Sequence, residues 1–117
     1  MKIEDTKSLA WIGDAILSLY ARKWILDQSS IHAKEREEVF QSMTTNAFLS
    51  HWGDPTKVES RIGKIFKEEG LEKAMLYIEL TILPIAIKRQ KQKKQLGRYQ
   101  KKSLAGRDLR PFLESIK

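Results

Sequence analysis

The chain of 117 residues contains no cysteine. This absence excludes a disulfide scaffold, a thiolate metal site and a cysteine nucleophile, and it favours a cytoplasmic location. No run approaches the roughly 20 apolar residues that a membrane-spanning helix requires, so we expect no membrane partner. Residues 1–5 include no basic region followed by an apolar stretch, and we expect no signal peptide.

Histidine and recognisable catalytic patterns are also scarce. His32 and His51 are the two histidines, and neither has a second histidine at the spacing of a metal site. The sequence has no P-loop, no GxSxG and no GxGxxG pattern, and no stretch shows convincing strand alternation. The remaining candidates for chemistry are carboxylates and cations.

The apolar residues recur at steps of three and four, which predicts an all-α fold of about five helices. Asp5 or Thr6 can cap the first helix, and Pro84 should kink or break the fourth. The expected helices are 8–26, 33–51, 55–69, 71–83 and 85–95, followed by a loop at Gly97 and at 103–106 and by a short last helix at 108–116.

The charge is divided unevenly along the chain. Residues 1–85 carry 11 basic and 13 acidic residues, whereas residues 86–117 carry 11 basic and 2 acidic ones. We expect a helical domain at 1–85 and, at 86–117, a basic helix and tail that is not a separate domain. Such a block favours a polyanion, and its few apolar positions disfavour a lipid surface; the alternative is a solvated helix that binds nothing specific. The cations expected to contact the phosphates of a nucleic acid are Lys88, Arg89, Lys91, Lys93, Lys94, Arg98, Lys101 and Lys102.

Two carboxylates stand out against their surroundings. Asp14 lies within the most apolar predicted helix and follows Gly13, although both residue types are unfavourable inside a helix. Glu59 falls at the edge of the apolar stripe of a later helix, where a solvated glutamate is the alternative. If the two helices cross, Asp14 and Glu59 form a carboxylate pair that suits Mg²⁺, with Mn²⁺ as a second possibility.

The two carboxylate segments resemble the signature segments of the ribonuclease III catalytic domain. The first is Leu9-Ala10-Trp11-Ile12-Gly13-Asp14-Ala15-Ile16-Leu17, and the second is Val58-Glu59-Ser60-Arg61-Ile62-Gly63-Lys64-Ile65-Phe66 with Gly70-Leu71-Glu72 after it. The resemblance covers roughly residues 6–80. It implies that Asp14 and Glu59 bind the metal and are catalytic, and it places Gly13 and Gly63 at points of close approach.

Among these enzymes the chain is most similar to the Mini-III type, which lacks a separate double-stranded-RNA-binding domain. Standard members have acids at the positions of Ala10 and Thr56, and Mini-III enzymes resemble this chain in lacking both. A connection of a few dozen residues in Mini-III relatives is reduced here to residues 52–55. The resemblance implies a homodimer that cleaves double-stranded RNA with Mg²⁺, as in the maturation of ribosomal RNA precursors.

A second hypothesis keeps the fold without the chemistry. The shortened middle region and the two missing acids favour a catalytically inactive module that binds RNA or the ribosome. The Asp14–Glu59 pair in its glycine context favours the enzyme. Candidates for a dimer interface are Trp11, Leu17, Trp24 and a face of the fourth helix, because a core and a dimer seam look alike in one sequence.

Overall fold

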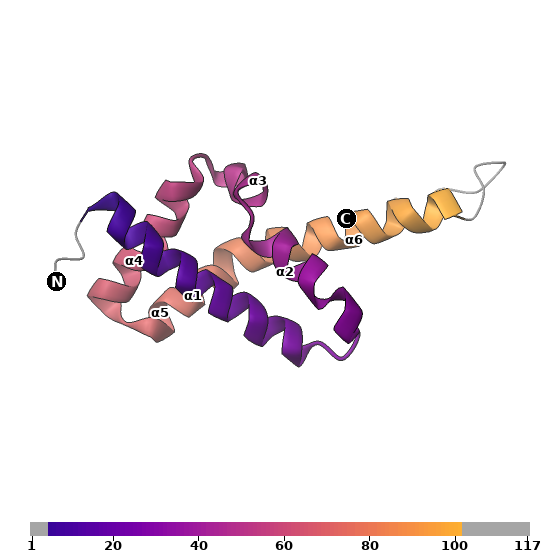
Figure 1. Ribbon diagram of the computed structural model, residues 1–117, viewed down its shortest axis with the longest axis horizontal. Helices are drawn as coiled ribbons and strands as arrows, with labels where there is room; N and C mark the ends of the chain where they lie inside the picture. The colour runs from indigo at the N-terminus through magenta and orange to yellow at the C-terminus, as the bar shows by residue number, and fades with distance from the viewer. Residues whose placement is uncertain (1–4, 102–117) are drawn as a thin grey trace.

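The computed structural model describes residues 5–101, with side chains up to residue 92. Within this range all regular elements are helical, which confirms the all-α prediction for the part of the chain described. Figure 1 shows α1 crossing in front of α4 and α5. The elements are α1 (Thr6–Asp27), η1 (Ala33–Glu35), α2 (Arg36–Thr44), α3 (Asn46–Leu49), η2 (Ser50–Trp52), α4 (Pro55–Glu69), α5 (Leu71–Tyr77), η3 (Ile78–Ile82) and α6 (Leu83–Lys101).

The first helix begins where the sequence offers a cap. The Asp5 carboxylate accepts a hydrogen bond from the Ser8 backbone N–H at 2.9 Å, so Asp5 rather than Thr6 is the N-cap. The three- and four-residue spacing of apolar residues in 8–26 predicts that Leu19 faces inward, but its side chain is 44% exposed, so this prediction is wrong. Leu17 was a candidate for the dimer interface, but it is fully buried in the core and this prediction is also wrong.

The single helix predicted over 33–51 is divided into four short elements. Thr45 causes the main division because its backbone is extended, with φ −73° and ψ 156°. Its side chain accepts a hydrogen bond from the Phe48 backbone N–H, so Thr45 ends α2 and caps α3 at once. The resulting bend brings Phe48 and Leu49 into the core.

Helix α4 has the predicted bounds, 55–69. The Asp54 carboxylate accepts from the Thr56 backbone N–H at 3.0 Å, and Pro55 occupies the first turn, where its missing N–H costs nothing. Gly70 ends the helix with φ 93°, a conformation that strongly favours glycine. Both ends of α4 are therefore determined by local residues.

The helical path continues through the region of Pro84 instead of breaking there. Residues Ile78–Ile82 form the π-helical turn η3, and the Leu83 N–H donates to the Ile78 carbonyl five residues earlier. A wider turn accommodates the proline that follows, because a proline ring clashes with the carbonyl four residues before it. Helix α6 then runs through Gly97, so the predicted loop at that residue is wrong; the predicted elements at 103–106 and 108–116 lie outside the described residues.

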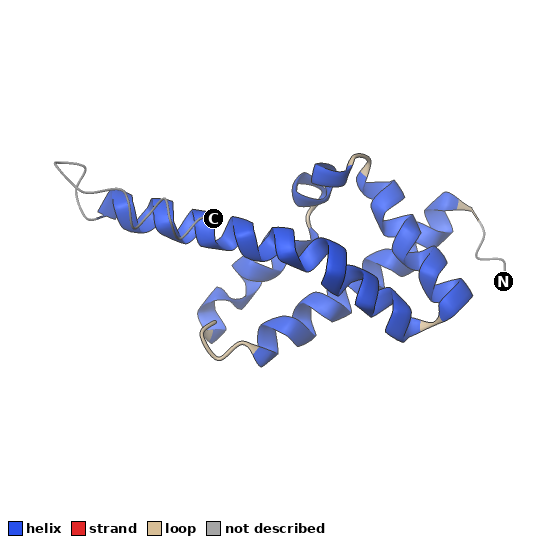
Figure 2. Ribbon diagram, turned by 180° about the vertical axis from the view of Figure 1, so that it is seen from behind, coloured by secondary structure: helices blue, strands red, loops and turns tan. Residues whose placement is uncertain are grey.

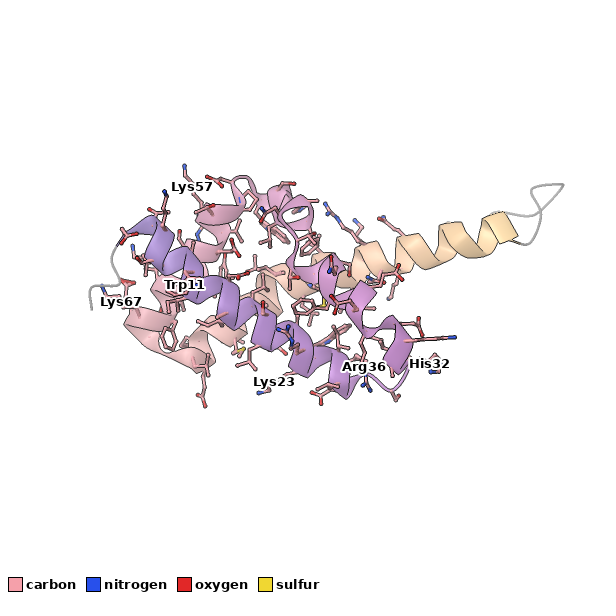
Figure 3. The ribbon with its side chains drawn as sticks, in the orientation of Figure 1. Trp11, Lys23, His32, Arg36, Lys57 and Lys67 are labelled. Carbon is pink, nitrogen blue, oxygen red and sulfur yellow. The ribbon has the colours of Figure 1, made fainter. Side chains whose placement is uncertain are left out.

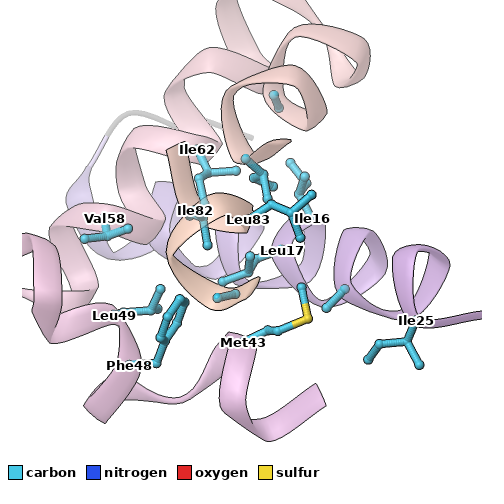
Figure 4. Close-up of a cluster of buried hydrophobic side chains, with 14 of the residues drawn as sticks. Ile16, Leu17, Ile25, Met43, Phe48, Leu49, Val58, Ile62, Ile82 and Leu83 are labelled. Atoms are coloured by element: carbon cyan, nitrogen blue, oxygen red, sulfur yellow. The ribbon is translucent and has the colours of Figure 1, made fainter. Parts of the chain in front are cut away.

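One apolar core joins these elements (Figure 4). Its largest fully buried side chains come from α1, α2, α3, α4 and η3: Leu17, Met43, Leu49, Ile62, Ile78 and Ile82. Leu83 and Ala86 extend the core into the first turns of α6, so the expected boundary at residue 85 falls inside a helix. The C-terminal part of α6 extends beyond the other helices (Figure 2). None of the described helices has the length and apolar character to cross a membrane.

Candidate carboxylate site

The site begins with the crossing of α1 and α4, where two glycines allow the backbones to meet. A Cβ atom added to Gly13 would lie 1.7 Å from the Glu59 carbonyl oxygen, and one added to Gly63 would lie 2.0 Å from the Leu9 carbonyl oxygen. No side chain fits at either point. The structure thus places both predicted close-approach glycines in direct backbone contact with the opposite helix.

This crossing brings Asp14 and Glu59 together. Asp14 follows the glycine that touches the Glu59 backbone, so the two carboxyl groups lie beside the point of contact. They are within hydrogen-bonding reach of each other. The Asp14 side chain is exposed and Glu59 is half-buried, so the pair lies at the surface end of the helix contact.

The proximity changes the acid chemistry of Glu59. Partial burial, the hydrogen bond to Asp14 and repulsion from the Asp14 charge raise the pKa of Glu59 to about 7. Each of these causes disfavours a second negative charge at the site. Near neutral pH Glu59 is therefore divided between its protonated and ionised forms, and a bound cation would favour the ionised form.

An open pocket of about 430 Å³ surrounds the pair. Trp11, labelled on α1 in Figure 3, lines the pocket. Its side chain is 76% exposed. Helix α3 adds Asn46, which the sequence reasoning missed because α3 itself was not predicted. The lining residues are Lys7, Ala10, Trp11, Asp14, Asn46, Thr56 and Glu59.

The donor set fits a hard cation that keeps most of its water. Mg²⁺ is usually bound through one or two carboxylates, with water or phosphate oxygens completing its octahedral shell. Asp14 and Glu59 provide two, and the Asn46 side chain lines the same pocket. Among the residues described, no group of three or more His, Cys, Asp or Glu side chains is placed to hold a metal. The pair alone thus suits a largely hydrated ion.

Seven of the predicted RNA-binding cations lie on α6, and none of those whose side chains are described lines this pocket. Lys88 and Lys91 are exposed. Arg89 contacts residues of η2 and α3. Its Nη2 donates to His51 Nδ1 at 3.2 Å, and its guanidinium lies 5.3 Å from the centre of the Phe48 ring. Lys93, Lys94, Arg98 and Lys101 lie on α6 beyond the described side chains, and Lys102 lies outside the described residues.

A second group of cations was not predicted from the sequence to bind RNA. Lys57, Arg61, Lys64 and Lys67 line one groove beside α4. Their spacing of four, three and three residues is the signal that could have identified one helix face. It was obscured because acids and core residues are interleaved with them, so that 55–69 has four basic and three acidic residues.

Comparisons with protein-family models, with curated proteins and with solved structures found no match to this chain. Any functional assignment therefore depends on the residues and geometry described above.

Proposed function

We propose that the chain is an Mg²⁺-dependent endoribonuclease that cleaves double-stranded RNA as a homodimer, with precursors of ribosomal RNA as one class of substrate. The observation that carries this proposal is the Asp14–Glu59 pair. Two helices that are distant in sequence bring these carboxyl groups within hydrogen-bonding reach, in an open pocket, through a crossing at which two glycines allow the backbones to touch.

The residues of the pocket have distinct roles in this proposal. Asp14 and Glu59 would hold Mg²⁺, with Glu59 in its ionised form. When bound, Mg²⁺ supplies a Lewis acid for the phosphodiester and an activated water. Lys7 adds a positive charge at the pocket, which favours an approaching phosphate. Because the pocket is open, a duplex can reach the pair without a conformational change.

The resemblance to the ribonuclease III domain supports the same assignment. The four positions that it associates with acids are those of Ala10, Asp14, Thr56 and Glu59. All four line the same pocket, although they come from two helices about 45 residues apart in sequence. Spacings of four and three residues place Ala10 beside Asp14 and Thr56 beside Glu59, and the crossing of α1 and α4 brings the two pairs into one pocket.

The test is cleavage of a long RNA duplex with Mg²⁺, with Mn²⁺ and with EDTA. We expect cleavage that requires the ion, and a loss of more than about 100-fold in Asp14→Asn and in Glu59→Gln, since even outer-shell partners of metals typically contribute 10–100-fold. Asp27→Asn and Glu72→Gln are matched controls, because these exposed acids lie on α1 and α5 away from the pocket.

The result would also separate the enzyme from an inactive module. The presence of only two carboxylates in the pocket favours the inactive alternative. Tight binding of the duplex with no cleavage in either ion would establish a binding module and reject the enzyme. Cleavage by the wild type that persists in both pocket variants would reject this site.

A further inference from the structure

We propose that a cationic groove on the outer side of α4 binds the backbone phosphates of an RNA duplex. The groove has a volume of about 570 Å³ and is lined by Thr6, Leu9, Lys57, Ser60, Arg61, Lys64, Lys67 and Glu68. We call it the α4 groove. The inference rests on the proposed function only in taking RNA as the partner. It assigns RNA recognition to the helices that precede α6 as well as to α6.

The cations of the α4 groove form a continuous row. Lys57 and Lys67 are ten residues apart, which corresponds to about 15 Å along a helix. A row of this length can face several consecutive backbone phosphates of an RNA strand. In Figure 3, Lys57 and Lys67 lie toward the same end of the molecule as Trp11.

The basic side chains of α4 line the α4 groove, whereas its acid Glu59 lines the carboxylate pocket. Glu68 is the one acid among the groove's lining residues, against four cations, although residues 1–85 as a whole carry more acids than bases. Glu59, on the same helix, lines the carboxylate pocket instead. An anion near the body therefore meets concentrated positive charge at this groove and negative charge at the adjacent site.

The chemistry of the lining indicates backbone phosphate. Lysines act as point charges toward phosphate and Arg61 offers a planar fork of donors, which suits two phosphate oxygens. The lining contains no aromatic ring on which a base could stack. Its one large apolar residue, Leu9, is buried, so the groove offers little to insert into lipid.

The α4 groove and the carboxylate pocket are close enough to serve one duplex. Thr6 on α1 and Lys57 on α4 line the α4 groove. Their neighbours in sequence, Lys7 and Thr56, line the carboxylate pocket. The two sites thus flank the α1–α4 crossing. A strand whose phosphates occupy the α4 groove places neighbouring phosphates at the carboxylate pair.

The test measures duplex binding without metal. The full chain is titrated against a fluorescent 20-base-pair RNA duplex in EDTA at several salt concentrations, comparing K57Q/R61Q/K64Q with the control K23Q/K34Q/R36Q. Both variants lose three exposed cations, but Lys23 and Arg36 lie along the lower edge of the helical bundle in Figure 3, away from Lys57 and Lys67. We expect the groove variant to bind at least about 10-fold more weakly and its salt slope to fall by 2 to 3, about one for each phosphate contact.

Equal weakening in both variants would overturn the proposal, because net charge alone would then explain binding. Failure of the wild type to bind the duplex, or binding only to anionic phosphatidylserine vesicles, would overturn it as well. Circular dichroism checks the fold, and the single variant Arg61→Gln, with an expected slope change of about one, keeps the test decisive if the triple variant is unfolded.

The same measurements distinguish this inference from the proposed function. Asp27→Asn should bind the duplex as the wild type does, since this exposed residue lines neither the α4 groove nor the carboxylate pocket. Groove-dependent binding without cleavage would uphold the α4 groove and reject the enzyme. Cleavage by the wild type with equal binding by both charge variants would uphold the enzyme and reject the groove.

Discussion

At the residue scale, Glu59 links folding to pH. Its pKa is about 7 in the folded chain, above its ordinary value of 4.5. Between these values the folded chain holds more protons than the unfolded chain, so the free energy of unfolding must fall as pH rises from about 4.5 to about 7. We expect Glu59→Gln to flatten this part of the profile, as measured by urea unfolding at pH 5 and pH 7.5.

The matched control for this prediction is Glu72→Gln, which removes an exposed carboxylate outside the pocket. It should retain the wild-type dependence on pH. A wild-type stability that rises between pH 5 and pH 7.5 while Glu59→Gln behaves identically would contradict the assignment. Mg²⁺ should stabilise the wild type more at pH 8 than at pH 6, because the ion competes with the proton on Glu59.

Two other residues of the pocket allow the site to be strengthened. Ala10 and Thr56 line it without contributing a carboxylate. We expect Ala10→Glu combined with Thr56→Asp to bind Mn²⁺ at least about 10-fold more tightly than the wild type, because affinity rises with the number of charged ligands. Electron paramagnetic resonance of free Mn²⁺ measures the difference. Unchanged affinity would show that the pocket does not enclose an ion.

The sequence indicated some of these residues and not others, for physical reasons. Asp14 was conspicuous because an acid and a glycine interrupt an apolar stripe, and Glu59 because it borders one. Arg89 was assigned to RNA, but its contact with His51 joins segments 38 residues apart. A composition count cannot show such a contact, since it depends on how the helices pack.

At the scale of the elements, the α1–α4 crossing depends on backbone contact. Gly13→Ala would place a methyl group against backbone atoms that cannot rotate away. Overpacking costs up to about 3 kcal/mol, and the better helix propensity of alanine returns about 1 kcal/mol, so we expect a net loss of about 2 kcal/mol. Urea unfolding measures this loss.

The control for the crossing is Lys23→Ala, an exposed position on the same helix, which should leave stability within about 0.5 kcal/mol. Gly63→Ala should behave like Gly13→Ala because it meets the Leu9 backbone in the same way. Either glycine variant with wild-type stability and wild-type metal affinity would show that the helices need not be this close.

The elements differ in how far local signals determine them. The bounds of α4 were predicted correctly because Asp54, Pro55 and Gly70 act within one turn of its ends. The division at Thr45 was missed, since a threonine is tolerated inside helices and its role as a cap appears only when Phe48 packs into the core. Tertiary packing decided between two locally acceptable conformations.

At the scale of the whole molecule, exposed apolar side chains bear on the proposed homodimer. Trp11 is 76% exposed and Leu26 is 63% exposed, both on α1. We expect sedimentation to show a dimer whose dissociation constant rises at least about 10-fold in Trp11→Ser, since large aromatic residues dominate interface energies. Lys23→Ser, on the same helix, is the control. A chain that is monomeric at every concentration would contradict the prediction.

The π-helical turn at residues 78–82 has a consequence for the whole charge distribution. A π-turn contains one residue more than the corresponding α-turn, and one residue turns a following helix by about 100°. Without that residue, Arg89 would no longer face His51, and Gln90 would no longer reach its hydrogen-bond partner Ser42. The extra residue therefore sets the rotation of α6 about its own axis, and with it which basic side chains face the body and which face an approaching polyanion.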